Sequence, residues 1–268
     1  MGQYMAFALL RHAVRLVFAN WRDALKISAV LYLMQAGFAA VVAFNAHPLT
    51  AVPPSAALGT SLLVLASVII QGVLYTWVAV AWHRFVLLDE TPNNYVPMFN
   101  TSRMLGYIGG WLLITLVIVG VAIIGFIVVG IFGAIHATII AIPIGIVLAA
   151  LLILMGYRLG LILPAASVDR RLTLRDSWTA TRGSTWLIIR LALLSFLAVV
   201  IIELPVFLLA SPAEPNLLTE IWATVVGWFV LMVGVALLTT LYGYFIEHRP
   251  IQGMPMPPQA PPPVPAEV

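Results

Sequence analysis

The chain has 268 residues, of which 62% are hydrophobic and 9% are charged, whereas ordinary soluble proteins carry about 25% charged residues. This composition excludes a soluble globular fold, and the lack of cysteine excludes disulfide scaffolds, cysteine-ligated zinc, iron–sulfur clusters and thiol nucleophiles. The formal charge of +3 comes from thirteen basic residues spread along the chain, so it forms no concentrated phosphate-binding face and predicts no nucleic-acid partner.

Residues 1–24 are expected to form a cytoplasmic amphipathic helix that lies on the membrane. Its apolar stripe consists of Leu10, Val14, Val17 and Trp21. An adjoining stripe is basic and consists of Arg11, Arg15, Arg22 and Lys26. Two such stripes are typical of a helix along an anionic lipid leaflet, so these four basic residues are predicted contacts of anionic lipid at the cytoplasmic face.

Residues 25–249 are expected to form an all-α transmembrane domain, a polytopic bundle of six spans. A span needs about 20 apolar residues, and six stretches have that length. They are 25–44, 58–82, 107–132, 137–163, 186–210 and 221–246. Only residues 133–136 separate the third from the fourth, and a single helix of their combined length would far exceed the bilayer thickness. We therefore expect a tight turn there.

The positions of lysine and arginine predict the orientation, because basic short loops stay in the cytoplasm. With six spans, all thirteen basic residues fall on one side of the membrane. They are Arg11, Arg15, Arg22, Lys26, Arg84, Arg103, Arg158, Arg170, Arg171, Arg175, Arg182, Arg190 and Arg249. The opposite connections, 45–57, 133–136 and 211–220, contain none. Both termini are therefore expected in the cytoplasm.

Two more surface helices are expected, before the third and fifth spans. The weaker pattern lies around residues 95–104. The clearer one is 174–182. A capping-box sequence that begins at Thr173 marks its start, and Gly183 marks its end. Its predicted anionic-lipid contacts are Arg171, Arg175 and Arg182.

Residues 250–268 are rich in proline and are expected to form a disordered cytoplasmic tail. Such a segment is either a docking peptide for a partner with an aromatic groove or an extension without a partner. The second reading is favoured because the tail is short and has no flanking charge.

Four polar side chains are expected at bilayer depth, where an unpartnered polar group costs several kcal/mol. They are Gln35, Gln71, Arg190 and Glu203. The glutamines are expected to fix helix packing through interhelical hydrogen bonds. Arg190 is expected to extend towards the cytoplasmic interface. Glu203 precedes Pro205, so it either bonds a neighbouring helix or lines a small water-filled cavity.

Catalytic, cofactor and metal sites are not predicted. The five histidines are scattered over both faces, and His83 beside Arg84 is interpreted as an interfacial residue rather than a haem or metal ligand. Asp89, Glu90, Asp169 and Asp176 are expected to be solvated loop charges. The membrane-embedded glycines are expected to allow close helix packing. They are Gly106, Gly110, Gly120, Gly125, Gly130, Gly156 and Gly160.

The segment YRLGLILPAASVDRRLTLRDSWTATRGSTW, which starts at Tyr157, resembles a known group. It is similar to bacterial six-span proteins related to the membrane domain fused to some glycerophosphodiester phosphodiesterases, a largely uncharacterised superfamily. Pro164, Asp169, Ser177, Trp178, Arg182 and Gly183 carry the resemblance. It implies a multi-pass protein of the bacterial inner membrane and no catalytic residue, because the chemistry of the fused members belongs to a separate soluble domain. The AWHRFVLLDE segment fits no pattern of that group.

These observations favour a non-catalytic membrane protein that organises lipid or a membrane partner, which includes a second copy of the chain. The alternative is a small-solute or ion transporter, which requires polar groups along one continuous path. An intramembrane enzyme is disfavoured by the missing acid, base and metal constellation.

Overall fold

The computed structural model describes residues 2–45, 54–134, 138–209 and 217–252. All regular secondary structure in these residues is helical. The helices are α1 (Gly2–Ala19), α2 (Trp21–Asn45), α3 (Pro54–Leu88), α4 (Thr101–Ala134), α5 (Thr138–Leu159), α6 (Ile162–Ser167), α7 (Leu174–Ala180), α8 (Thr185–Leu209) and α9 (Leu217–Phe245). The predicted all-α fold class is confirmed.

Six segments are long and apolar enough to cross a membrane, as predicted. They are Trp21–Val42, Ser61–Leu88, Thr101–Ala134, Ile142–Ser167, Thr185–Val206 and Ile221–Phe245. The fourth segment is not one straight helix, because α5 ends at Leu159 and α6 follows after a turn. The expected break between the third and fourth segments falls between the end of α4 and the start of α5, and residues 135–137 lie outside the described part of the chain.

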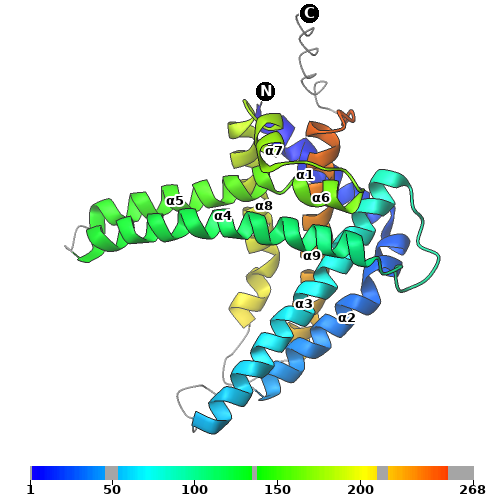
Figure 1. Cartoon of the computed structure of the whole chain (residues 1–268), viewed down its shortest axis with the longest axis horizontal. Coiled ribbons are helices and arrows are strands. Elements are labelled where there is room, and N and C mark those ends of the chain that lie inside the picture. Colours follow the sequence, from blue (N-terminus) through cyan, green and yellow to red (C-terminus); the bar gives the residue numbers. More distant parts are fainter. Residues whose placement is uncertain (1, 46–53, 135–137, 210–216, 253–268) are drawn as a thin grey trace, which may run out of the picture.

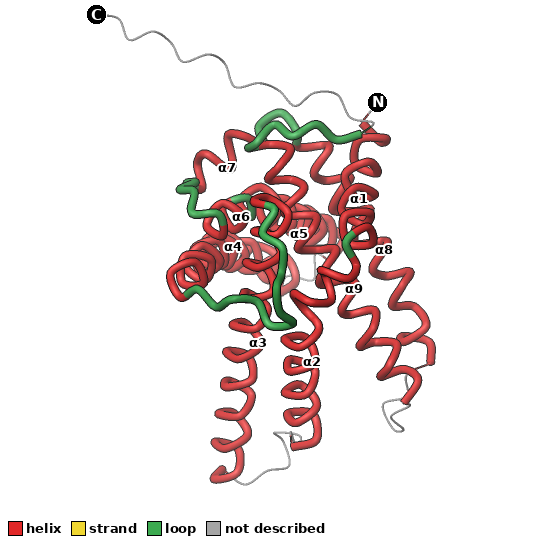
Figure 2. The backbone as a smooth tube through the Cα atoms, turned by 90° about the vertical axis from the view of Figure 1, so that its right-hand side faces the viewer, coloured by secondary structure: helices red, strands yellow, loops and turns green. Residues whose placement is uncertain are grey.

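The spans form three helical hairpins, α2/α3, α4/α5 and α8/α9. The hairpins diverge from a common region near α1, α6 and α7, which we call the base (Figure 1). The α4/α5 hairpin runs crosswise to the α2/α3 hairpin. Figure 2 shows the segment between α3 and α4 crossing beside these two hairpins at the base.

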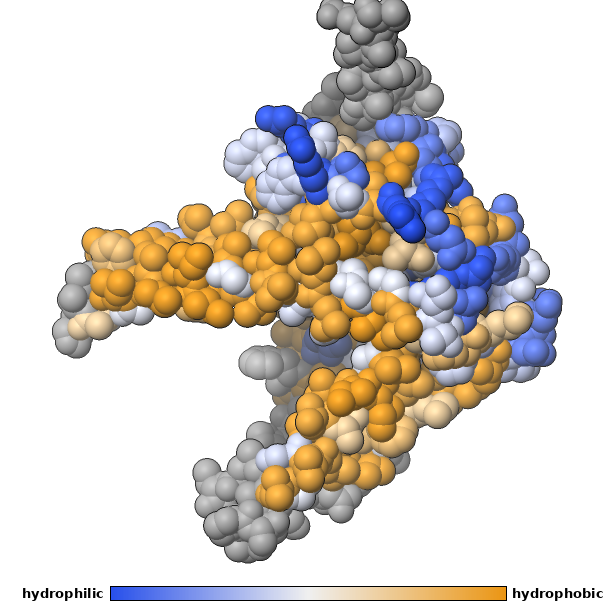
Figure 3. Space-filling view, in the orientation of Figure 1, coloured by the Kyte–Doolittle hydropathy of each residue, from blue (hydrophilic) through white to orange (hydrophobic). Residues whose placement is uncertain are grey.

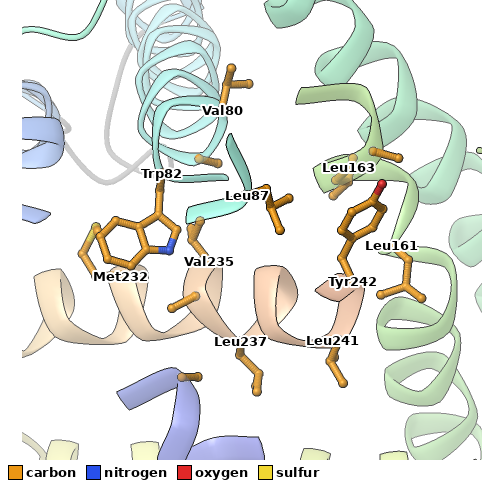
Figure 4. Packing of buried hydrophobic residues seen from close by; sticks show 14 of the residues in the cluster. Val80, Trp82, Leu87, Leu161, Leu163, Met232, Val235, Leu237, Leu241 and Tyr242 are labelled. Carbon is orange, nitrogen blue, oxygen red and sulfur yellow. The ribbon is translucent and has the colours of Figure 1, made fainter. Parts of the chain in front are cut away.

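The hydrophobic core lies at the base, where α3, α6 and α9 meet. Trp82 and Tyr242 are completely buried. Figure 4 shows Trp82 of α3 beside Met232 and Val235 of α9, and Leu163 of α6 close to Tyr242. A fully buried aromatic side chain contributes several kcal/mol, so this cluster holds the three hairpins together at one end.

Beyond the base, the hairpins expose apolar side chains. Leu116 of α4 and Ile139 of α5 are 70% and 86% exposed. Figure 3 shows hydrophobic residues along the hairpins, whereas hydrophilic residues gather around the base. An apolar surface of this extent requires lipid or another apolar surface against it.

Three of the seven glycines make the close approach that was predicted from the sequence: Gly110, Gly125 and Gly160, where an added Cβ atom would lie 3.1 Å from Leu238 Cδ1 of α9. A Cβ atom at Gly125 would lie 2.3 Å from Leu148 Cδ1, so α4 and α5 are in direct contact there. A Cβ atom at Gly110 would lie 3.3 Å from Leu163 Cδ2. The prediction is wrong for Gly120 and Gly130, which face open space within 4 Å. These two glycines lie on a face of α4 that α5 does not contact.

The helix α1 is part of the core, which the prediction of a surface helix did not include. Its buried residues are Ala6, Ala8, Leu9, Ala13 and Val17, and the helix packs against α8 and α9. Of the predicted apolar stripe only Val17 is buried, and Trp21 is 51% exposed. The helix ends at Ala19, and Asn20 separates it from α2, so it is shorter than the predicted helix 1–24.

The other two surface helices have opposite outcomes. α7 is confirmed, with Thr173 as its N-cap in a complete capping box with Asp176. Gly183 has a φ of +85°, which favours glycine after a helix. The helix expected around 95–104 is wrong: residues 89–100 form an irregular segment, and Thr101 begins α4.

Deleting residues 254–268 is expected to leave the protein folded and inserted. The proline-rich part, 253–268, lies outside the described residues, whereas Ile251 is buried and must be kept. The amount of truncated protein in the membrane fraction and its thermal unfolding should equal those of the full chain. Loss of membrane accumulation would show that the tail has a structural role.

Candidate functional site: a charged junction at the base

Arg84 lies in the last turns of α3, and its residue is only 8% exposed. Its Nε and Nη2 both donate to the carboxylate of Glu90. Its Nη1 donates to the carbonyl oxygen of Ser167 over 2.8 Å and lies 3.4 Å from Asp169 Oδ2. All three guanidinium nitrogens are therefore engaged. The planar guanidinium of arginine is suited to the bidentate contact with the Glu90 carboxylate.

Asp169 links Arg84 to α4. It follows α6 with a φ of 59°, a left-handed conformation that aspartate tolerates better than most residues. Its Oδ2 accepts from Arg103 Nε of α4 over 3.1 Å. The side chains of Glu90 and Asp169 are 51% and 59% exposed, so they are partly solvated as predicted. They are not free loop charges, however, because they bind the arginines of α3 and α4.

A second set of ion pairs ties the end of α9 to the same region. Glu247 lies 2.6 Å from Arg249 Nε and 3.4 Å from Arg170 Nη1. Arg249 in turn donates to the carbonyl oxygens of Val86 and Leu87 at the end of α3. Basic groups near a helix C-terminus stabilise its unpaired carbonyls.

We call these seven residues the charged junction. They are Arg84, Glu90, Arg103, Asp169, Arg170, Glu247 and Arg249. They come from, or directly follow, all three hairpins. The junction therefore cross-links the hairpins through charge, above the apolar core.

His83 lies beneath the junction and is completely buried. Its Nδ1 lies 2.8 Å from the hydroxyl oxygen of Thr239 in α9, and its Nε2 lies 3.5 Å from the hydroxyl oxygen of Tyr107 in α4. The prediction of an interfacial histidine is wrong. His83 instead connects α3, α4 and α9. Its ring is buried next to polar side chains of neighbouring helices and does not face solvent or lipid headgroups.

Arg158, at the end of α5, organises the connection to α8. Its guanidinium carbon lies 4.6 Å from the ring centroid of Trp178, and its Nη2 donates to the hydroxyl of Thr185. Ser177 donates to the backbone carbonyl of Arg158. Hydrogen bonds from Thr173 hold the pKa of the Asp176 carboxyl below its usual range. The Ser-Trp pair that carries the family resemblance thus fastens α7 to α5.

The predicted lipid contacts are at the base and largely exposed. Arg11, Arg15, Arg22, Arg171, Arg175 and Arg182 are exposed. Lys26 is half-buried and lies 3.5 Å from Asp23 Oδ1. Arg22 lies against Trp21, with 5.4 Å between its guanidinium carbon and the ring centroid.

The four predicted intramembrane polar residues do not form one cluster. Gln35 and Gln71 are half-buried on the α2/α3 hairpin, and among the described residues neither makes a side-chain hydrogen bond. The expected interhelical bonds are therefore not found there. Arg190 is exposed on α8. Glu203 is half-buried, has no hydrogen bond or ion pair with the described residues, and interacts electrostatically with Tyr32 of α2.

Sequence reasoning missed Arg84, His83 and Arg158 as structural centres. The signal was the unexplained AWHRFVLLDE segment, which places a histidine and an arginine inside the last turns of an apolar helix. Within the described residues, no group of three His, Asp or Glu side chains could hold a metal ion. His47 and His136 lie outside those residues.

The fold and the junction together define a multi-pass α-helical membrane protein. Comparison of the chain with known families, with curated proteins and with solved structures gives no match.

Proposed function

We propose that this chain is a non-catalytic, multi-pass protein of the bacterial inner membrane that organises lipid or a membrane partner. The observation that carries the proposal is the exposed face of α1. One face of this helix is held against α8 and α9, so the helix is fixed to the base. The opposite face is free to meet a membrane surface.

The exposed face of α1 carries aromatic and basic side chains. It consists of Tyr4, Phe7, Arg11, Arg15 and Phe18, and Arg22 follows at the start of α2. At 100° per residue the five positions of α1 share one side, opposite Leu9 and Val17. Aromatic rings prefer the headgroup level, and arginine binds lipid phosphate through a bidentate contact. This combination supports contact with anionic lipid.

A non-catalytic role is supported by the ion pairs of three acidic residues at the base. Glu90, Asp169 and Glu247 are all engaged in ion pairs with arginines. A general base must be free to take a proton, and a carboxylate paired with a guanidinium is a poor one. Structural cross-linking accounts for all three carboxylates.

Two further parts of the proposal, the orientation in the membrane and the type of membrane, rest on the sequence. The cytoplasmic placement of both termini rests on the thirteen basic residues, all of which fall on one side of the six expected spans, and on the positive-inside rule. The bacterial inner membrane rests on the resemblance to the six-span superfamily. The apolar sides of the hairpins would be covered by lipid, by a partner protein or by a second copy of the chain.

The lipid part of the proposal is tested by replacing Arg11, Arg15 and Arg22 together with glutamine. Thermal unfolding is followed in mixed micelles that contain phosphatidylglycerol or phosphatidylcholine. We expect phosphatidylglycerol to raise the unfolding temperature of the parent more than phosphatidylcholine does, and the glutamine variant to lose most of that difference. The matched control has lysine at the same three positions and should keep it. Equal stabilisation of the parent by both lipids would contradict the proposal.

The second candidate function is a transporter for an ion or small solute, and Glu203 is the observation that favours it. Its carboxylate is half-buried on α8 and has no hydrogen bond or ion pair with the described residues. Tyr32, with which it interacts electrostatically, donates to the carbonyl oxygen of Thr224 over 2.9 Å. An intramembrane acid that has no hydrogen bond or ion pair is a default candidate site for a cation or a proton.

Replacing Glu203 with glutamine separates the two functions. A structural role predicts that Glu203→Gln and Glu203→Leu change the free energy of unfolding by only about 1 kcal/mol, with Leu neutral or stabilising. A transport role predicts that Glu203→Gln abolishes the cellular phenotype of the gene while the amount and the unfolding temperature of the protein stay unchanged. Equal cellular function of parent, Gln and Leu proteins would remove the transporter candidate.

A further inference from the structure

A cavity of about 460 Å³ lies at the base between the segment 89–100 and the helices α2, α3 and α4. The segment passes from the end of α3 to the start of α4 beside these helices (Figure 2). Ligand pockets in proteins measure roughly 300 to 1,000 Å³, so this cavity has the size of a ligand site.

One wall of the cavity is apolar. It includes Ile27 of α2, Trp77 and Val80 of α3, and Phe99 from the segment before α4. The rings of Trp77 and Phe99 meet edge to face, with 4.9 Å between their centroids. This wall lies where the α2/α3 and α4/α5 hairpins diverge, so it continues into their exposed apolar sides.

The other wall is polar. It includes Arg84, Glu90, Asn93, Asn94, Asn100 and Arg103. Asn100 caps α4, because its Oδ1 accepts from the backbone N–H of Arg103 over 3.2 Å. The start of a helix carries a partial positive charge, which adds to that of the arginine.

The two arginines of the cavity differ in the donors that they leave free. Arg84 uses all three of its guanidinium nitrogens within the protein. Arg103 binds Asp169 through Nε alone, so its two terminal nitrogens have no hydrogen-bond partner among the described residues. Its side chain is 27% exposed. A guanidinium with two free terminal nitrogens is suited to a phosphate oxygen pair.

We propose that this cavity binds the headgroup of one phospholipid molecule. The phosphate binds Arg103 at the start of α4, and the side-chain amides of Asn93 and Asn94 donate hydrogen bonds to the ester and glycerol oxygens. The first acyl carbons lie against Trp77 and Phe99, and the chains leave between the diverging hairpins. This inference deepens the proposed function and rests on it, since it names one lipid that the protein holds at a defined site.

The amphipathic lining is what selects a lipid rather than a free phosphate ion. A phosphate ion needs only the polar wall, and it would leave the apolar wall in contact with water. A phospholipid satisfies both walls and buries apolar area as well. The position of the cavity at the level of the charged junction places the headgroup where lipid headgroups lie.

The test is the lipid content of the purified protein, measured by native mass spectrometry after mild-detergent extraction. We expect the parent to retain one phospholipid per chain. Arg103→Gln should lower this occupancy roughly tenfold, because it removes a charge-assisted contact. Arg190→Gln is the matched control: it removes an exposed arginine of α8 that does not line the cavity, and it should retain the lipid. Equal occupancy in the parent and in Arg103→Gln would overturn the proposal.

A second variant keeps Arg103 and fills the space. Ala81 of α3 lines the cavity, so Ala81→Phe should also exclude the lipid although every charge remains. Size-exclusion chromatography shows whether each variant is folded. A folded Ala81→Phe protein that still carries the lipid would place the lipid elsewhere and contradict the proposal.

Thermal unfolding with added ligands distinguishes the sources of phosphate. A short-chain phosphatidylglycerol should raise the unfolding temperature of delipidated parent protein more than that of Arg103→Gln, because the variant keeps only the contribution of the α1 face. Inorganic phosphate at the same concentration should have no effect, and an equal shift would contradict the lipid assignment. The preference of the α1 face for anionic lipid should survive in Arg103→Gln, so failure of this inference is distinguishable from failure of the proposed function.

Discussion

Replacing Arg84 with methionine is expected to lower the free energy of unfolding by about 3 kcal/mol. Methionine matches the aliphatic stem of arginine, so the packing of α3 changes little. The change removes the only group that joins the carboxylate of Glu90, the carboxylate of Asp169 and the carbonyl of Ser167 among the described residues. The carbonyl of Ser167 would be left buried without its donor, Glu90 would lose its counter-charge, and Asp169 would keep only Arg103. Thermal or urea unfolding in detergent measures the loss.

Two variants control for the arginine itself. Arg182→Met removes an exposed arginine of the same base and should change stability by less than about 0.5 kcal/mol. Arg84→Lys keeps the charge, but an ammonium cannot make the bidentate contact with Glu90, so most of the loss should remain. A stability of Arg84→Met within error of the parent would show that the junction does not hold the hairpins together.

Replacing Gly125 with leucine is expected to separate α4 from α5 and to lower the free energy of unfolding by about 3 kcal/mol. Even the first side-chain atom would lie 2.3 Å from Leu148 Cδ1, which is far inside van der Waals contact. The side chain of Leu148 would have to move before a larger group could fit. Unfolding of the purified variant measures the effect.

The chain supplies both a matched control and a rescue for this prediction. Gly120 lies on the same helix and has nothing within 4 Å of an added Cβ, so Gly120→Leu should be neutral or slightly stabilising. Leu148→Ala should recover part of the stability of Gly125→Leu, because it empties the space that the new side chain needs. Equal effects of Gly120→Leu and Gly125→Leu would mean that α4 and α5 are not in contact at Gly125.

The six spans follow from the sequence because crossing a bilayer is a requirement on length and apolarity alone. The predicted third span, 107–132, lies inside the observed segment Thr101–Ala134, and the other five agree to a similar degree. The capping box at Thr173 is also local, since its two partners are three residues apart. Local rules of this kind need no knowledge of which helices are neighbours.

The charged junction could not be predicted in the same way. Arg84 and Asp169 are 85 positions apart, and hydropathy says nothing about which span ends meet. In α1, the buried stripe includes Ala6 and Ala13, whereas the prediction weighted larger apolar residues. Small side chains allow the close approach of α8 and α9, so the face that packs is not the most hydrophobic one. The difference between Gly120 and Gly125 likewise depends on which face of α4 meets α5.

The most direct test of a six-span protein whose charged base faces the cytoplasm is thiol accessibility in intact cells. The chain contains no cysteine, so single cysteines can be placed at Ala51, Ala213 and Thr179 without background. Ala51 and Ala213 lie outside the described residues, between α2 and α3 and between α8 and α9, and Thr179 is exposed in α7 at the base. An impermeant thiol reagent should label Ala51→Cys and Ala213→Cys in intact cells, and it should label Thr179→Cys only after the cells are opened. Labelling of Thr179→Cys in intact cells would contradict the orientation and, with it, the cytoplasmic placement of the α1 face and of the charged junction.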